Sequence, residues 1–252
     1  MPHLFRLRHL TTLCCVSIAL GACASEDSPM NRSAVADTTR PAADQGRDAD
    51  RKPAKMLVFA RVKTGEAVVD FLPGKGYFTR LFSTAVGASG QVYAVTPQLF
   101  VDSHKGATLP SIAGENGHAN VHDIVAANGT LGLPVQADLV WTSQNYHDVH
   151  VWGGPDAAAQ LNKAVFQALK PGGLYVILDH AGPAGLDEAG IKKLHRIDEA
   201  TVIREVEAAG FAPDGETNVL RNPADPHTAI VFDPSIRGKT DQFLLRFRKP
   251  SK

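Results

Sequence analysis

Cysteine is nearly absent from the chain, and its few positions are informative. All three cysteines, Cys14, Cys15 and Cys23, lie near the N-terminus, so the residues after position 23 contain no thiol. Disulfide bonds, zinc–thiolate sites and cysteine nucleophiles are therefore excluded from any domain that these residues form. We predict no metal site from the sequence.

Net charge is absent as well, because 26 Lys and Arg residues balance 26 Asp and Glu residues. Such a chain has no field of one sign to attract a polyanion, so nucleic acid is not an expected partner. A small-molecule substrate is the expected partner instead. With 252 residues, 44% of them hydrophobic, the chain is long enough to bury one sizeable core.

The N-terminal hydrophobic run is too short to span a bilayer permanently. It covers residues 10–20 and follows Arg6 and Arg8 in a stretch without an acid. This arrangement is typical of a secretory signal peptide. Residues 1–22 are therefore predicted to be a signal peptide and are set apart from the folded domain.

The end of this run, Leu20-Gly21-Ala22-Cys23, resembles the bacterial lipobox. The resemblance implies that Cys23 receives a lipid and becomes the mature N-terminus, and that Ala24 favours the outer membrane. The protein would then lie in the periplasm, with the lipid as its membrane contact. The alternative is an ordinary signal peptide cut after Ala22 or Ala24, with Cys23 incidental.

Residues 23–51 are rich in Ser, Thr, Asp, Arg and Pro without an apolar period, which is typical of a flexible tether. In residues 52–252, strand and helix patterns alternate, which predicts one α/β domain with helices on both faces of a mostly parallel, doubly wound sheet. Alternation of apolar residues with Arg246 and Arg248 predicts an antiparallel last strand. Seven strands are expected, near residues 67–71, 91–95, 121–125, 137–142, 174–178, 211–220 and 243–247.

The loop after the first predicted strand is the most informative segment. A buried strand ends at Asp70, a turn containing Gly74 and Gly76 follows, and a helix begins at once. This geometry directs unpaired N–H groups at a ligand. The spacing fits neither G-x-G-x-x-G nor G-x-x-x-x-G-K-[ST], so a dinucleotide or a nucleoside triphosphate is not indicated.

The segment resembles the first motif of class I S-adenosylmethionine-dependent methyltransferases, an apolar strand, an acid and then G-x-G-x-G. The resemblance implies a Rossmann-like fold and a loop that wraps the methionine part of S-adenosylmethionine. On this match Asp70, Gly74 and Gly76 line the cofactor, with Thr79 close behind. Leu72 departs from the motif, because it stands where the first glycine belongs.

Further matches follow in the order that the family shows. Thr96 ends the second strand, where the family usually has an acid for the ribose hydroxyls, and it cannot replace a charged bidentate acceptor. Asp123 occupies the region that meets adenine, with a surface Asp as the alternative, and Thr142 ends the fourth strand beside the cofactor. The run 170–173, Lys-Pro-Gly-Gly, resembles the family's L-K-P-G-G signature.

Polar residues gather after the fourth strand, where open α/β sheets place their ligands. His147 is the first candidate general base for methyl transfer, with Asp148 to orient it and Tyr146 to shape the pocket. The alternatives are a surface loop histidine and a packing tyrosine. His180, at the end of the fifth strand, is a second candidate base, and the long loop 221–241 could cover the substrate.

Two functions remain open on these patterns. The first is an S-adenosylmethionine-dependent methyltransferase acting on a small molecule or an envelope component. The second is an exported, non-catalytic ligand-binding domain with a degenerate methyltransferase fold, favoured by the Leu72 and Thr96 departures and by the cytoplasmic origin of the cofactor. A third hypothesis, dinucleotide binding of the dehydrogenase type, has less support, because the glycine spacing does not fit.

Overall fold

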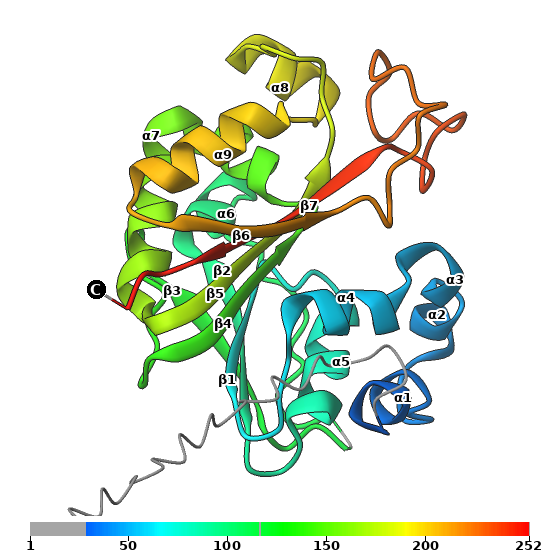
Figure 1. The fold of residues 1–252 in the computed structure, drawn as a ribbon, viewed down its shortest axis with the longest axis vertical. Coiled ribbons are helices and arrows are strands. Elements are labelled where there is room, and N and C mark those ends of the chain that lie inside the picture. The colour runs from blue at the N-terminus through cyan, green and yellow to red at the C-terminus, as the bar shows by residue number, and fades with distance from the viewer. Residues whose placement is uncertain (1–28, 116, 252) are drawn as a thin grey trace, which may run out of the picture.

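A seven-stranded sheet forms the centre of the protein. The computed structural model describes residues 29–115 and 117–251. The strand order is β3-β2-β1-β4-β5-β7-β6. Strands β1 to β5 run parallel, and β7 runs antiparallel to both β5 and β6 (Figure 1). The strands are β1 (Ala67–Phe71), β2 (Gln91–Pro97), β3 (Val121–Ala126), β4 (Ala137–Ser143), β5 (Leu169–His180), β6 (Ala212–Thr217) and β7 (Gln242–Arg248).

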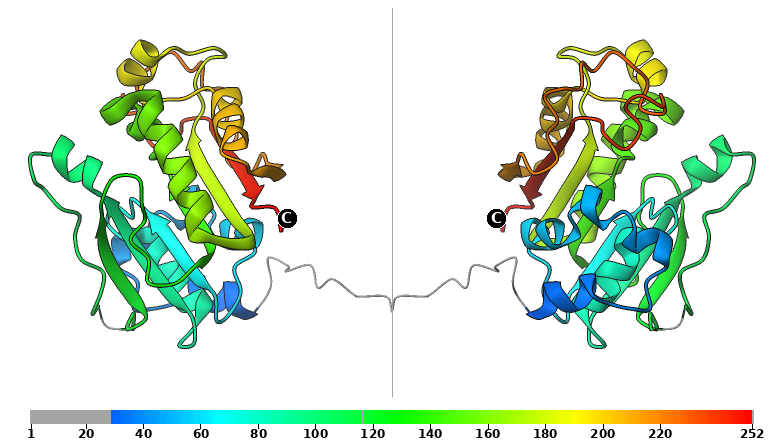
Figure 2. Two further views of the ribbon diagram at one scale, coloured as in Figure 1. Left: turned by 90° about the vertical axis from the view of Figure 1, so that its left-hand side faces the viewer. Right: turned by 90° about the vertical axis from the view of Figure 1, so that its right-hand side faces the viewer.

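Helices cover both faces of this sheet, as Figure 2 shows from two sides. One face packs against α1 (Pro29–Val35), α4 (Pro53–Ala60) and α5 (Tyr77–Val86). The other packs against α6 (Gln98–Ser103), α7 (Tyr146–Ala168), α8 (Glu188–Leu194) and α9 (Glu199–Ala208). The predicted Rossmann-like, mostly parallel seven-stranded fold with an antiparallel last strand is therefore confirmed.

The central strand β1 explains why two cores form. All five of its residues are buried, and their side chains alternate between the two faces. Val69 and Phe71 enter the core beneath α7, whereas Val68 enters the core beneath α5. On the α5 side, Trp141 packs against Phe78 with ring centroids 4.6 Å apart. A strand that is apolar on both faces is what a parallel sheet between two helix layers requires.

Helix α7 begins nine residues earlier than the sequence pattern predicted. The predicted start at Pro155 is real, but Gly154 breaks the helix there with φ 68° and ψ −167°, and another helical segment precedes it from Tyr146. A proline at the first helical position suits the second segment. The first segment carries Asn-Tyr-His-Asp directly off the end of β4, so these polar residues lie on a helix start rather than in a loop.

The predicted tether differs from the structure over its described part. Residues 29–51 form α1, α2 (Ala42–Gln45) and α3 (Asp48–Arg51), which lie beside α4 and α5 (Figure 1). Ala34 is fully buried there, and the buried Arg40 guanidinium pairs with Asp48 at 2.6 Å. Ion pairs, and not a periodic apolar face, hold this segment against the domain. The hydrophobic pattern of the sequence therefore did not predict its helices.

Charged side chains also hold the long loop 221–241, which precedes β7. Arg196, which follows α8, lies 2.9 Å from Asp225, and both side chains are fully buried. Asp225 also accepts the N–H of Asp241 at 2.7 Å, which ties the two ends of the loop together. The loop therefore packs against the segment that joins α8 to α9, on the carboxyl-end side of the sheet.

No helix within 29–115 or 117–251 is both long and apolar enough to cross a membrane. The predicted signal peptide, 1–22, and Cys23 lie outside the described residues.

The docking of the N-terminal segment is testable through Asp44, which lies 2.8 Å from the buried Arg80 guanidinium. Asp44→Ala removes one carboxylate from that guanidinium while Glu115 remains, so we expect a loss of about 1–3 kcal/mol in the free energy of unfolding. Trypsin should also cleave after Arg47 and Arg51 faster. Urea unfolding and limited proteolysis measure the two effects. The exposed Asp50→Ala is the control, and equal proteolysis of both variants would contradict a docked segment.

Candidate functional site

The loop after β1 keeps the backbone path of a glycine-rich loop despite Leu72. This residue has φ 57°, in the left-handed region that glycine favours, and its side chain is buried in the core on the α7 side. Its carbonyl accepts the Asn145 side-chain amide at 2.9 Å. Gly76, at φ 82°, admits no side chain, because a Cβ there would lie 2.6 Å from Ile112. Leu72 therefore replaces the glycine without diverting the chain.

This loop forms one wall of a pocket of about 320 Å³, here called the glycine-loop pocket. The opposite walls come from the end of β4 and from the N-terminal segment. Gly74 faces open space, with no atom within 4 Å of where its Cβ would lie. The lining includes both signs of charge: Arg47, Arg51, Asp70, Leu72, Pro73, Gly74, Lys75, Tyr77, Phe78, Ser143, Gln144 and Asn145.

Asp70 is the buried acid of the glycine-loop pocket. Its side chain accepts a hydrogen bond from the Thr79 hydroxyl at 2.7 Å, so both residues predicted from the motif meet here. Burial raises the pKa of Asp70 to about 7, against the opposing effects of that hydrogen bond and of the Arg51 charge. A cationic group entering the pocket would stabilise the ionised carboxylate.

Arg51, at the end of α3, is the half-buried cation of the pocket, whose lining also includes the exposed Arg47 and Lys75. Its guanidinium lies 4.8 Å from the Tyr77 ring centroid and 5.2 Å from that of Phe78, and it donates to Gln144 at 2.7 Å. Burial lowers the pKa of Arg51 to about 10, which still leaves it charged at neutral pH. Among the described residues no carboxylate forms a salt bridge with it. The pocket therefore offers an unpaired guanidinium to an anion.

Two hydroxyls at the end of β4 also lack partners within the described chain. Thr142 Oγ1 and Ser143 Oγ are buried and make no hydrogen bond to protein atoms. Buried polar atoms normally have a partner, and a water molecule or a polar ligand would supply one here. Thr142 was predicted to bind the cofactor, but its neighbour Ser143 is the residue that lines the glycine-loop pocket.

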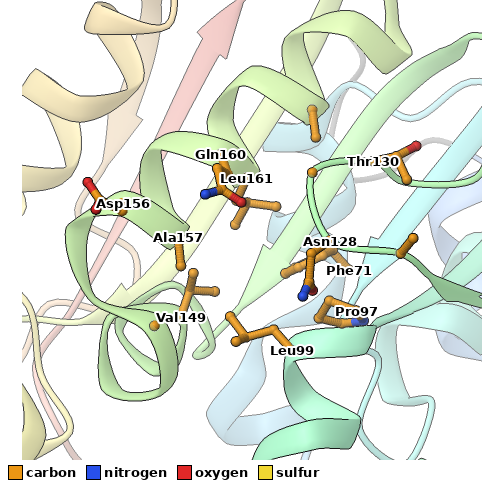
Figure 3. Close-up of a pocket in the computed structure, with 14 residues that line it drawn as sticks. Phe71, Pro97, Leu99, Asn128, Thr130, Val149, Asp156, Ala157, Gln160 and Leu161 are labelled. Carbon is orange, nitrogen blue, oxygen red and sulfur yellow. The ribbon is translucent and has the colours of Figure 1, made fainter.

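A second pocket, of about 220 Å³, opens on the other side of β1 (Figure 3). Phe71 lines it, whereas its neighbours Asp70 and Leu72 line the first pocket, so both pockets open at the carboxyl end of the same strand. Apolar side chains dominate the walls, with the amides of Asn128 and Gln160 among them. We call it the α7 pocket because much of its wall comes from that helix.

Two residues predicted for the cofactor do not line the α7 pocket. Thr96 is buried on the α5 side of β2, and the next residue, Pro97, lines the pocket instead. Asp123 lies three residues before the end of β3 and accepts hydrogen bonds from the N–H groups of Ile112 and Ala113. Because side chains alternate along β2, Pro97 lines the α7 pocket where Thr96 was expected. Because β3 continues to Ala126, Asn128 lines it where Asp123 was expected.

The predicted catalytic residues separate into two groups. His147 is buried and lies between two carboxylates, with Nδ1 2.7 Å from Asp179 and Nε2 3.3 Å from Asp148. His195 Nδ1 approaches Asp148 at 3.1 Å, and the His180 ring lies 5.7 Å from that of His147. Asp179 and His195 were not predicted for this cluster, because Asp179 lies near the end of β5, His195 follows α8, and only the fold brings them here.

Tyr146 does not belong to this cluster. Its hydroxyl donates to Glu205 of α9 at 2.8 Å and accepts from Asn162 at 2.7 Å, deep between two helices. Glu205 also lies 3.1 Å from the fully buried His150. Tyr146 therefore has the packing role that the sequence left open, rather than the pocket-shaping role.

The two carboxylates also bear on the predicted role of His147 as a base. Although burial opposes protonation, Asp179 and Asp148 raise the pKa of His147 to about 10. Burial lowers the pKa of His180 to about 4. In the protein as described, His147 is thus a cation at neutral pH and His180 is neutral. A proton acceptor at neutral pH must be uncharged, so these two pKa shifts favour His180 over His147 for that role.

No family model matches the sequence. No curated protein matches it either. Solved structures, in contrast, match in large numbers.

An S-adenosylmethionine-dependent methyltransferase from Aquifex aeolicus matches with a TM-score of 0.54 and 19% identity over 82% of this chain and 94% of that one. A putative sarcosine dimethylglycine methyltransferase from Galdieria sulphuraria matches at 0.53 with 15% identity, over 81% and 85%. The [4+2]-cyclase SpnF matches at 0.53 with 18% identity, over 84% and 82%. The chain has the fold of the class I S-adenosylmethionine-dependent methyltransferases.

The burial of Asp70 predicts how stability depends on pH. The pKa of this acid is raised from 3.8 to about 7 in the folded protein. The contribution of Asp70 to the free energy of unfolding is therefore fully present at low pH and is lost as the pH rises through about 7. One pKa unit corresponds to about 1.4 kcal/mol. The free energy of unfolding of Asp70→Asn, relative to that of the unchanged protein, should therefore increase by roughly 2–4 kcal/mol from about pH 4 to about pH 8. Urea unfolding at both pH values measures this, and parallel pH profiles would contradict it.

Proposed function

We propose that the protein is a methyltransferase that binds S-adenosylmethionine across the carboxyl end of β1 and acts on a small molecule or an envelope component. The fold supports the cofactor class, because the compared structures of this fold include a methyltransferase that depends on it. The observation that carries the proposal is the pair of charges in the glycine-loop pocket. Arg51 and Asp70 match the carboxylate and the ammonium group of the methionine part.

The glycine-loop pocket suits the methionine part in size and in chemistry. Arg51 has no carboxylate partner among the described residues, so a ligand carboxylate would supply one. Ser143 Oγ lacks a hydrogen-bond partner, and Gly74 leaves the wall open for backbone approach. The cofactor itself supplies an electrophilic methyl group on a sulfonium, and the residues of this chain supply binding and alignment.

The α7 pocket suits the adenosine part. Phe71, Leu99 and Val149 offer apolar walls for a flat ring, and Asn128 offers an amide that can donate and accept hydrogen bonds (Figure 3). The exposed Asp156, also in the lining, is a carboxylate that can serve ribose hydroxyls in place of the acid missing at Thr96. A cofactor that reaches from one pocket to the other passes over Phe71 and Leu72.

Export remains a prediction from the leader, which lies outside the described residues. An exported methyltransferase needs its cofactor outside the cytoplasm, which is why the non-catalytic binding domain is the second candidate. The SpnF cyclase shows that the same fold serves a reaction other than methyl transfer. The second candidate keeps the fold and binds a different ligand, so binding of S-adenosylmethionine separates the two.

Arg51 can be tested with two ligands that differ in the amino-acid part. S-adenosylhomocysteine carries the carboxylate and 5′-methylthioadenosine lacks it. Arg51→Ala should weaken S-adenosylhomocysteine binding by about 10- to 100-fold, since a charge-assisted hydrogen bond contributes about 1.5–3 kcal/mol. Methylthioadenosine affinity should hardly change. Calorimetry measures both, and the exposed Arg204→Ala is the control. An equal loss for both ligands, or for neither, would refute the assigned role.

The adenosine assignment has its own test in Ala157, a half-buried residue of α7 that lines the α7 pocket. Ala157→Phe fills space there and should abolish binding of both ligands. Ala157→Ser adds one oxygen and should leave both affinities within about threefold, an effect below 1 kcal/mol. Thermal melting confirms that each variant is folded. Unchanged affinity in the folded Phe variant would place adenosine elsewhere.

A further inference from the structure

A group of nitrogen and oxygen ligands lies beyond the carboxyl ends of β4 and β5. One ligand atom from each of His147, Asp148 and His195 lies within 4.8 Å of the other two. The first two residues begin α7 and the third follows α8, so the fold brings together positions 147 and 195. The sequence predicted no metal site, and the cysteine-free domain had excluded only thiolate sites.

We propose that His147, Asp148 and His195 form a binding site for a divalent transition metal ion such as Zn²⁺. Two imidazole nitrogens and one carboxylate oxygen are a donor set that suits zinc, iron, cobalt or nickel, whereas magnesium and calcium prefer oxygen ligands alone. Three protein ligands leave at least one coordination position open, as in catalytic rather than structural zinc sites. The inference concerns metal binding and stands independently of the proposed methyltransferase activity.

The spacing of the ligand atoms supports the site. Asp148 Oδ1 lies 3.3 Å from His147 Nε2 and 3.1 Å from His195 Nδ1. Tetrahedral zinc has ligand bonds of about 2.0–2.1 Å, which set neighbouring ligand atoms about 3.4 Å apart. The remaining pair, one nitrogen from each histidine, lies within 4.8 Å, so the two rings would move toward each other to surround an ion.

Asp179 provides the second support, because it fixes the ring of His147. Its carboxylate is fully buried and accepts the His147 N–H at 2.8 Å, the His180 N–H at 2.7 Å and the His147 ring at Nδ1. A carboxylate on the far nitrogen of a metal-binding histidine orients the ring and leaves the other nitrogen for the metal. His147 Nε2, the atom that faces Asp148, is the nitrogen left free in this way.

Charge and access agree with this assignment. A metal ion bound at His147 Nε2 would displace the proton from that nitrogen, and the carboxylates of Asp148 and Asp179 would then balance the two charges of the ion. His147 and Asp179 are closed off from solvent, but Asp148 and His195 are half-buried and leave a path to the site. Phe232 of the 221–241 loop is exposed, and its ring is tilted against that of His195 with centroids 5.0 Å apart, which shields one side.

The test uses the full-length protein, purified without a histidine tag and stripped with a chelator. Titration with Co²⁺, followed by its visible absorption, should show one bound ion per chain with imidazole ligation, and Zn²⁺ should displace it while excess Mg²⁺ should not. His195→Asn should weaken Co²⁺ binding at least 100-fold, because it removes one ligand. Asn suits this position because His195 has φ 52°, a region that Asn tolerates.

Two further variants separate ligation from folding. The exposed His122→Ala, on β3, removes a histidine outside the cluster and should bind Co²⁺ as the unchanged protein does. Asp179→Asn should lower Co²⁺ affinity about 10- to 100-fold but keep the absorption spectrum, since the ligands remain. Thermal melting checks that every variant is folded. Absence of a Co²⁺ spectrum in the unchanged protein, or equal binding by folded His195→Asn, would overturn the metal site.

Discussion

A carboxylate buried at the end of the central strand is the constraint on which the arrangement of this protein depends. Asp70 lies between two parallel neighbours in the middle of the sheet, where its charge is costly unless other groups support it. Thr79 supplies a hydroxyl from α5, and Arg51 supplies a positive charge from the N-terminal segment. The guanidinium reaches the pocket because α1 to α3 dock against α5 through ion pairs. The N-terminal segment is thus part of the site, and a zwitterionic ligand would complete the charge balance of both residues.

The same edge of the sheet carries two kinds of chemistry, one on each side of the end of β4. Ser143, Gln144 and Asn145 line the glycine-loop pocket, and His147 and Asp148 begin the histidine cluster within the next few residues. Gln144 bonds both Arg51 and Gln242, and Gln242 is paired in register with His180. The glycine-loop pocket and the cluster of His147, Asp148 and His195 are therefore connected through one polar row across β4, β5 and β7. An acceptor that is activated at the cluster would lie beside a cofactor held by the loop.

The sequence predicted those parts of the fold that local patterns encode. The buried strand ending at Asp70, the glycine turn and the Lys-Pro-Gly-Gly run lie within short windows, so their order identified the sheet. The alternation of apolar residues with Arg246 and Arg248 identified the antiparallel last strand. Predictions failed where distant partners decide. The described part of the tether folds because Arg40 and Arg80 find carboxylates. Tyr146 turns into the helix interface toward Glu205, and His195 joins His147 only when β5 and α8 are in place. Thr96 and Asp123 were misplaced because strand alternation and the end of β3 shift each position by a few residues.

The central claim is that a zwitterionic adenosyl cofactor occupies the two pockets beside β1. Calorimetric titration of the unchanged protein with S-adenosylmethionine tests it most directly. The account predicts saturable binding of one molecule per chain, with adenosine alone binding more weakly because it lacks the groups that Arg51 and Asp70 hold. Absence of binding at millimolar S-adenosylmethionine, from protein shown to be folded by thermal melting, would contradict the account.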